Sequence, residues 1–167
     1  YNPFREKYMI TISSDVTETF PNFNNGISPY REEISDDILI DLWGYKPFDL
    51  SNFTEMANYA SYLKNYGLDD VIFIRHYWQR DGYDMTIPDV IPAHRPYGGD
   101  EELIPAGKLI SSFGWRFALH TNYTDYSPNY KDFNTDHAII NSTGQIRSGG
   151  TFGGVLNNFI KPFYYNY

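Results

Sequence analysis

Three apolar runs interrupt the polar background of this chain, and each of them ends in aromatic, His, Asp or Asn side chains. They cover residues 38–45 (ILIDLWGY), 71–78 (VIFIRHYW) and 117–123 (FALHTNY). All three runs are strand candidates, and the unbroken VIFI stretch of the second predicts a strand of a parallel sheet, because such strands are covered on both faces. In a parallel αβ barrel the strand ends carry the chemistry, so the pattern predicts a small-molecule site at these ends.

The spacing of apolar residues after the first run predicts a helix. Ser51 is the expected N-cap, Glu55 lies early in the helix, and Gly67 suits the left-handed position that follows a helix. The apolar residues of this helix recur at helical spacing: Phe53, Met56, Ala57, Ala60 and Leu63.

A second helix is predicted before the third strand. Asp100 is its expected cap and Gly114 its end, with the strand beginning at Trp115. Pro105 is expected to break the first turn or to move the start of the helix to itself. The preceding segment, 79–99, is a long Tyr-, Pro- and His-rich loop, and loops of this length are usually functional.

The two ends of the chain have a different texture. Residues 1–35 combine a strand candidate, Tyr8–Ile12, with a Pro- and Asn-rich loop, and are expected to form a lead-in or the edge of an upstream domain. After Tyr123 the pattern dissolves into turns with a flexible Gly-rich patch, and no fourth strand–helix unit is predicted. The second unit is therefore expected to span 36–167.

Alternating strands and helices predict an α/β fold, either a parallel barrel or a doubly wound sheet. No Gly-x-Gly-x-x-Gly or Walker motif follows a strand, so a nucleotide cofactor is not expected. The 167 residues are too few for a complete eight-unit barrel of about 250 residues. Because the chain starts at Tyr1 and not at Met, we expect a processed product or a piece of a longer protein.

Composition narrows the range of partners. The formal net charge is -8, and no basic stripe is present to bind phosphates, which argues against nucleic acid and anionic membranes. No apolar run reaches the roughly 20 residues needed for membrane insertion. The 16 Tyr, 12 Phe and 3 Trp lie mostly in polar contexts and suit a sugar ring, although tyrosines that simply fill a core are the alternative.

The densest polar cluster follows the second strand, at 76–84 (HYWQRDGYD). Its Trp can stack on one face of a sugar while its charged side chains bind hydroxyls. The candidate site residues are His76, Trp78, Arg80 and Asp81. For Arg80 and Asp81 the alternative is a mutual ion pair that holds the loop in shape.

A second cluster, 120–125 (HTNYTD), follows the third strand. Because side chains alternate along a strand, His120 and Asn122 are expected to share one face, although His120 can also be a satisfied core residue. A site shared by both clusters requires Trp78 and His120 to lie side by side at one end of aligned strands. Motif spacing supports no metal site: the Asp residues of the loop do not match an EF-hand, and the chain has no Cys.

The string FIRHYWQRDGYDMTIPDVIPAHRPYGGDEEL, followed by GWRFALHTNYTDYSPNY, resembles the barrel domain of endo-α-N-acetylgalactosaminidase-like glycoside hydrolases. The resemblance runs from about Asp41 to Gly150 and depends on a WQRDGYD-like loop paired with an H-x-N-Y-x-D strand end. It implies a (β/α)8 barrel, of which 36–167 is the first part. The implied substrates are α-linked galactosaminides or related glycans, cleaved with retention by two carboxylates.

The resemblance also implies which residues line the sugar pocket: His76, Trp78, Arg80, Asp81, His120, Asn122, Tyr123 and Asp125. In such enzymes the nucleophile and the acid/base come from strands beyond the third, so the catalytic residues of this chain stay unknown. The expected partners are a carbohydrate and the remainder of a larger chain or further subunits. A glycan-degrading role implies an extracellular or cell-surface location.

Three functions stay open on the sequence alone. The first is part of the barrel of a retaining glycosidase, which on its own hydrolyses nothing. The second is a non-catalytic carbohydrate-binding or surface-assembly protein that keeps the aromatic pocket. The third is a self-sufficient enzyme with Asp81 and Asp125 as its carboxylate pair.

Overall fold

The structure is a computed structural model that describes residues 10–19, 31–44, 52–152 and 154–160. The chain divides into two compact units, residues 1–36 and residues 37–167. Among the described helices, none is long and apolar enough to cross a membrane.

The first unit contains the 3₁₀ helix η1 (Val16–Thr19) and the short helix α1 (Arg31–Ile34). The predicted strand at Tyr8–Ile12 is wrong for residues 10–12, and residues 8 and 9 lie outside the described residues. Ile10 and Ile12 are 85% and 93% exposed, so these side chains pack on no surface that would support a strand.

A three-stranded parallel sheet is the centre of the second unit, in the order β1 (Ile38–Leu42), β2 (Val71–Arg75) and β3 (Arg116–Leu119). Ile40 pairs with Phe73, which pairs with Phe117. The α/β class with a parallel sheet is therefore confirmed. Each strand stops before the polar end of its apolar run, so the side chains expected to carry chemistry follow the strands.

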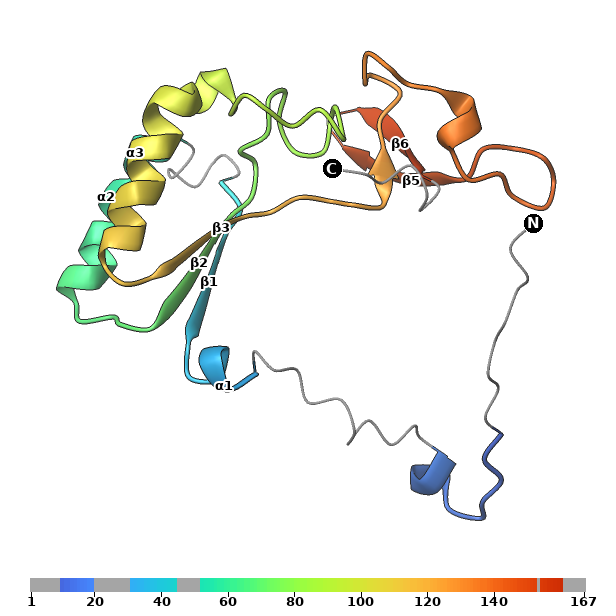
Figure 1. Cartoon of the computed structure of the whole chain (residues 1–167), viewed down its shortest axis with the longest axis horizontal. Coiled ribbons are helices and arrows are strands. Elements are labelled where there is room, and N and C mark those ends of the chain that lie inside the picture. Colours follow the sequence, from blue (N-terminus) through green and yellow to red (C-terminus); the bar gives the residue numbers. More distant parts are fainter. Residues whose placement is uncertain (1–9, 20–30, 45–51, 153, 161–167) are drawn as a thin grey trace. The chain divides into compact units, whose positions relative to one another are not determined.

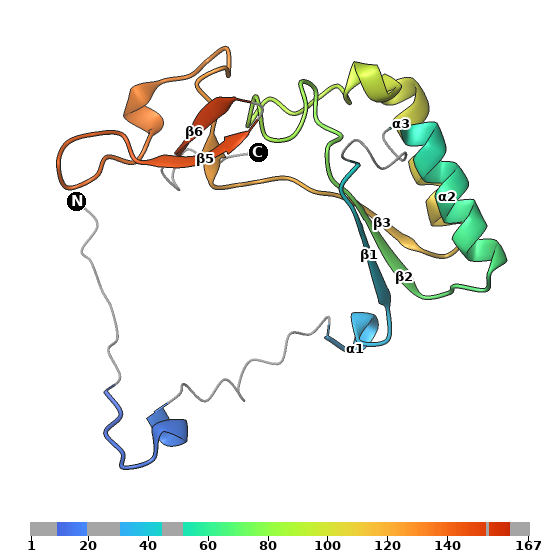
Figure 2. The same cartoon turned by 180° about the vertical axis from the view of Figure 1, so that it is seen from behind.

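Helices α2 (Phe53–Asn65) and α3 (Gly99–Ser112) both lie on one face of this sheet, as Figures 1 and 2 show. Gly107 brings α3 close to the sheet, because a Cβ there would lie 2.8 Å from Cε1 of Phe117. The hydrophobic core forms between the helices and the sheet, and its fully buried members are Phe53, Met56, Ala60, Phe73 and Ile110. The opposite face of the sheet carries no described helix.

The helix predicted between Ser51 and Gly67 is confirmed as α2, but its N-cap is Asn52. The Asn52 side chain accepts from the Glu55 backbone N–H at 2.7 Å, and the Glu55 carboxylate accepts from the Asn52 backbone N–H in return. The expected cap, Ser51, lies outside the described residues. Gly67 ends the helix with a φ of +86°, as predicted.

The cap of α3 corrects a second expectation. Gly98 occupies the N-cap position, while Asp100 lies inside the first turn and accepts from the Ala93 backbone N–H at 2.8 Å. Pro105 neither breaks nor starts the helix but lies within it. Its lost hydrogen bond is offset because α3 buries Leu103 and neighbouring residues on both sides of the proline against the core.

The region after Tyr123 contains a second, antiparallel sheet in the order β4 (Asp125–Tyr126), β6 (Val155–Phe159) and β5 (Ser148–Phe152). The 3₁₀ helix η3 (Thr135–His137) lies between β4 and β5 in the chain, and another, η2 (Arg95–Tyr97), precedes α3. The prediction of turns with a flexible Gly-rich patch is wrong for β5, because Thr151 and neighbouring residues pair with β6.

Candidate functional site

The carboxyl ends of the three parallel strands bring together side chains that are far apart in the sequence. Ile40 and Leu42 of β1 pack toward the helices, so the intervening Asp41 faces the other side of the sheet. His76 follows β2 and His120 follows β3. One edge of the sheet therefore presents a carboxylate and two imidazoles from three neighbouring strands, as the strand-end pattern predicted.

Four rings stack at this edge. The imidazoles of His76 and His120 lie face to face, with centroids 4.1 Å apart and planes inclined by 18°. The Trp43 indole stacks on the other side of His76, also at 4.1 Å, and Tyr83 from the long loop stacks on His120 at 5.4 Å. The Tyr83 hydroxyl lies 3.1 Å from Nε2 of His120. We call Trp43, His76, Tyr83 and His120 the ring stack.

The Asp41 carboxylate is held beside the ring stack by two N–H donors. Nε2 of His76 lies 2.6 Å from Oδ1, and Nε1 of Trp43 donates to Oδ2 at 3.2 Å. Because a carboxylate only accepts, the proton of neutral His76 is on Nε2. These two donors fix the orientation of the Asp41 side chain. Because the side chain is 43% exposed, its remaining lone pairs face solvent.

His76 is buried, and this burial sets its charge. Loss of solvent lowers the pKa of His76, and the adjacent His120 lowers it further, against the opposing effect of Asp41. The neutral imidazole is therefore favoured at neutral pH. Its Nδ1 atom is buried and has no hydrogen-bond partner, so the ring binds Asp41 through Nε2 alone.

Trp78 and His120 lie side by side, as the predicted site required. Nε1 of Trp78 donates to the backbone carbonyl of His120 at 2.6 Å. Trp78 is, however, 8% exposed and belongs to the hydrophobic core. It holds the end of β3 against the long loop, and it presents little ring surface to a ligand.

Arg80 and Asp81, the other two candidate site residues in this loop, do not form an ion pair with each other. Arg80 pairs with Asp89 at 2.5 Å, so the alternative of an Arg80–Asp81 ion pair is wrong. The loop folds back so that the backbone N–H of Arg80 donates to the carbonyl of Val90, which brings Asp89 within reach of Arg80. Asp81 is exposed.

A second cluster of polar side chains surrounds two buried carboxylates, those of Asp84 and Asp125. Asp84 accepts from the Gln79 side chain at 2.9 Å and from the Asn122 side chain at 3.4 Å. Asn157 of β6 donates to the Asp84 backbone carbonyl at 2.7 Å and to the Asp125 carboxylate at 3.4 Å. Asn122 thus lies between the strand ends and this buried pair.

Asp125 and Tyr123 differ sharply in exposure. Tyr123 is 69% exposed, whereas Asp125 is 3% exposed. Burial raises the pKa of Asp125, and the charge of nearby Asp84 raises it further, while the hydrogen bond from Asn157 lowers it. The Asp125 carboxyl is therefore a buried group of the C-terminal sheet with little access to a ligand.

Sequence reasoning did not assign Asp41, Trp43 or Tyr83 to the site. The signal for the first two was present, because the run ILIDLWGY ends in the same kinds of side chain as the other two strands. Tyr83 lies within the polar cluster 76–84, but only the fold of the loop brings its ring onto His120. Asn157 carried no local signal, since it lies 73 residues from its partner Asp84.

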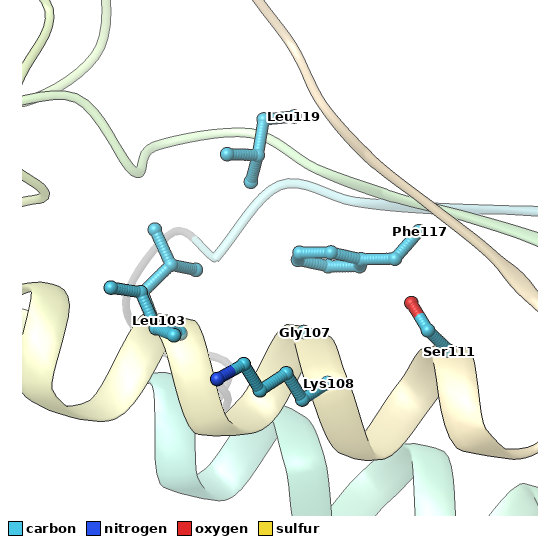
Figure 3. A pocket seen from close by; sticks show the side chains of 7 residues that line it. Leu103, Gly107, Lys108, Ser111, Phe117 and Leu119 are labelled. Carbon is cyan, nitrogen blue, oxygen red and sulfur yellow. The ribbon is translucent and has the colours of Figure 1, made fainter.

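A separate hollow of about 430 Å³ lies between α3 and β3, on the helix side of the sheet (Figure 3). Its lining is largely apolar: Leu103, Ile104, Gly107, Lys108, Ser111, Phe117 and Leu119. A sugar would find few hydrogen-bond partners there. Within the described ranges no group of three or more His, Asp or Glu side chains is arranged to hold a metal ion.

Comparison with known proteins gives a fold and no family. No family model and no curated protein matches the chain. Among solved structures, the α-N-acetylgalactosaminidase NagBb from Bifidobacterium bifidum, ligand-free, has a TM-score of 0.64 at 19% identity and covers 74% of this chain and 23% of its own. The complex of the same protein with GalNAc gives the same TM-score and identity, over 22% of its own chain.

A mutant of MutB in complex with the substrate sucrose has a TM-score of 0.54 at 13% identity. The match covers 81% of this chain and 31% of that one. This chain therefore spans less than a third of the length of these solved structures. At such identities the likeness shows a glycoside-hydrolase-like fold.

Proposed function

We propose that this chain forms the sugar-binding edge of a glycoside hydrolase barrel domain. The proposed substrates are α-linked galactosaminide-type or related glycans, cleaved with retention by two carboxylates. The observation that carries the proposal is the ring stack beside the fixed Asp41 carboxylate at the carboxyl edge of parallel strands. Aromatic faces suit the C–H patch of a sugar, and carboxylate and imidazole groups suit its hydroxyls.

The solved structures support this choice of ligand. NagBb is an α-N-acetylgalactosaminidase, and one of its structures contains GalNAc. On this proposal the sugar contacts Asp41, Trp43 and His120, while buried His76 holds Asp41 in place and Asn122 lies next to the site. The proposal places the protein outside the cell or at its surface, where such glycans occur.

The open edge of the sheet supports a barrel that continues beyond this chain. Within the described residues β3 pairs only with β2, so its other edge has no partner strand there, and the apolar hollow is lined by residues of α3 and β3 alone. A fourth parallel strand with its helix would pair there and fill the hollow. Further strand–helix units, and the nucleophile and acid/base with them, then come from a longer chain or from other subunits.

The burial of two carboxylates favours a second candidate, a non-catalytic carbohydrate-binding or surface-assembly protein. Asp84 and Asp125 are 0% and 3% exposed, so neither reaches a bound sugar. The same burial weakens the hypothesis that Asp81 and Asp125 form a catalytic pair. Among the described residues, only Asp41 presents an oriented and partly exposed carboxylate next to the ring stack, and retention needs two carboxyl groups about 5–5.5 Å apart.

Binding and turnover measured side by side separate the candidates. We expect the 167-residue chain to bind GalNAc, detected by NMR shifts of the histidine side chains, and to release no aryl alcohol from an aryl α-N-acetylgalactosaminide. His120→Ala should weaken binding by about tenfold or more, since it removes a stacked ring and a polar atom, whereas His137→Ala in η3 should not.

Each outcome has a distinct meaning. Turnover by a longer product of the same gene supports the glycosidase, and binding without turnover by that product supports the second candidate. Turnover by the 167-residue chain alone contradicts the proposal that its catalytic residues lie elsewhere. If the chain binds neither GalNAc nor sucrose, the site is not a carbohydrate site.

A further inference from the structure

The charge of the candidate site is determined by few groups. Asp41 contributes a carboxylate that two N–H donors hold in place and that remains 43% exposed. The titratable neighbours that face it are His76, His120 and Tyr83 from the ring stack, with the carboxylate of Asp84 farther back. Burial favours the neutral form of His76, so the imidazole orients the carboxylate without cancelling its charge.

Arg75, Arg80 and Arg116 do not neutralise this carboxylate. Arg75 lies on the helix side of the sheet, with its guanidinium 5.6 Å from the ring centre of Phe53 and 5.7 Å from that of Tyr97. Arg80 pairs with Asp89 in the loop. Arg116, at the start of β3, pairs with Asp37 at the opposite end of the sheet. The described edge therefore presents negative charge and hydrogen-bond acceptors.

We propose that Asp41 is a specificity-determining residue, which accepts hydrogen bonds from hydroxyls of an uncharged sugar and excludes sugars that carry a carboxylate or sulfate. The inference depends on the proposed carbohydrate-binding function. A carboxylate fixed through both oxygens accepts from adjacent hydroxyls at no further cost in side-chain ordering, and such charge-assisted hydrogen bonds are strong. An anionic group brought to the same place meets a like charge in a partly desolvated site.

The test compares neutral and anionic sugars on the full chain. The probe pairs are GalNAc with GalNAc 6-sulfate, and galactose with galacturonic acid, titrated by NMR or calorimetry. The wild type should bind each neutral sugar about tenfold or more tightly than its anionic partner. Asp41→Asn keeps one acceptor oxygen and removes the charge, so it should bind the neutral sugars about tenfold more weakly and reduce the preference to about threefold or less.

Asp69→Asn is the matched control. It removes the same charge at an exposed carboxylate that pairs with Lys64, before the amino end of β2, and should change neither affinity nor preference. If Asp41→Asn does not fold, the wild type measured at low and at high salt still tests the role of Asp41. About 0.5 M salt screens charges and should therefore reduce the preference of the wild type for neutral over anionic sugars.

The two proposals fail differently. A wild type that binds no sugar of either kind overturns the proposed function and this inference with it. A wild type that binds sugars with no preference for the neutral ones overturns the role of Asp41 alone. A preference that persists in Asp41→Asn, or in the wild type at high salt, also overturns that role and leaves the carbohydrate site intact.

Discussion

Gly44, two residues after the end of β1, lies against the buried guanidinium of Arg75. Its φ is +72°, and an added Cβ would overlap both terminal nitrogens of Arg75. A left-handed conformation costs an L-residue about 1–2 kcal/mol, and overpacking costs about 1–3 kcal/mol more. We expect Gly44→Ala to lower the free energy of unfolding by about 2–5 kcal/mol in urea denaturation.

Gly67, which follows α2, is the control for that prediction. Its φ is +86°, but no atom lies within 4 Å of the position that a Cβ would take. Gly67→Ala should therefore cost only the backbone part, about 1–2 kcal/mol. Equal losses in the two variants would show that Arg75 does not restrict residue 44.

Arg75 keeps its charge in spite of being buried. Burial lowers the pKa of its guanidinium to about 10, which is still above neutral pH, so the group next to Gly44 is a cation.

Asp125 makes stability depend on pH in a direction that the structure determines. Its pKa is raised in the folded protein, mainly by burial, so the folded state keeps this proton to higher pH than the unfolded state. The contribution of Asp125 to stability is therefore greatest below its unfolded pKa, about 3.9, and is lost as the pH rises through the folded value. At neutral pH the wild type retains a cost of burying this charge.

Asp125→Asn removes that charge and keeps an oxygen that can accept from Asn157. We expect the free energy of unfolding of the variant, relative to the wild type, to increase between about pH 4 and pH 7. Thermal unfolding at several pH values measures the difference. Asp132→Asn, at a 67% exposed side chain, is the control and should leave the profile unchanged; a variant profile parallel to the wild type would contradict the burial cost.

At the scale of elements, strong periodicity was enough to predict the core. The VIFI run became β2, and the apolar spacing after residue 52 became α2. Caps were harder to predict, because Ser51 and Asn52 are both good cap residues and only the reciprocal bonds with Glu55 choose between them. The start of α3 was misplaced for a similar reason: the Asp100 side chain binds the loop and not its own helix.

The antiparallel sheet was missed for a different reason. Its strands are short, β5 contains two glycines, and β4 has two residues. Such segments carry little intrinsic strand preference and are stabilised by pairing with residues far along the chain, as when Asp125 pairs with Phe159. Local patterns do not contain that information.

For the molecule as a whole, the sequence was enough to predict that the site lies at the carboxyl ends of the parallel strands. It was not enough to predict the direction in which individual side chains point. His76 and His120 meet as expected because parallel strands place their carboxyl ends at one edge. The Trp78 side chain packs in the hydrophobic core, and the Arg80 side chain pairs with Asp89. Both contacts depend on how the loop 79–99 folds back over itself. The sugar pocket implied by the resemblance stays a prediction for these residues.

The connection between that loop and the C-terminal sheet depends on Asn157, which is fully buried in β6. Its amide donates to the Asp84 carbonyl and to the Asp125 carboxylate, so Asn157→Ala leaves buried acceptors without this donor, at a cost of about 1–3 kcal/mol. We expect faster amide hydrogen exchange in the loop 79–99 and in β4, with exchange in α2 unchanged. Asn158→Ala, the adjacent and half-buried residue of β6, should leave exchange in the loop as it is. Equal exchange in the Asn157→Ala variant and the wild type would mean that the sheet does not hold the loop in place.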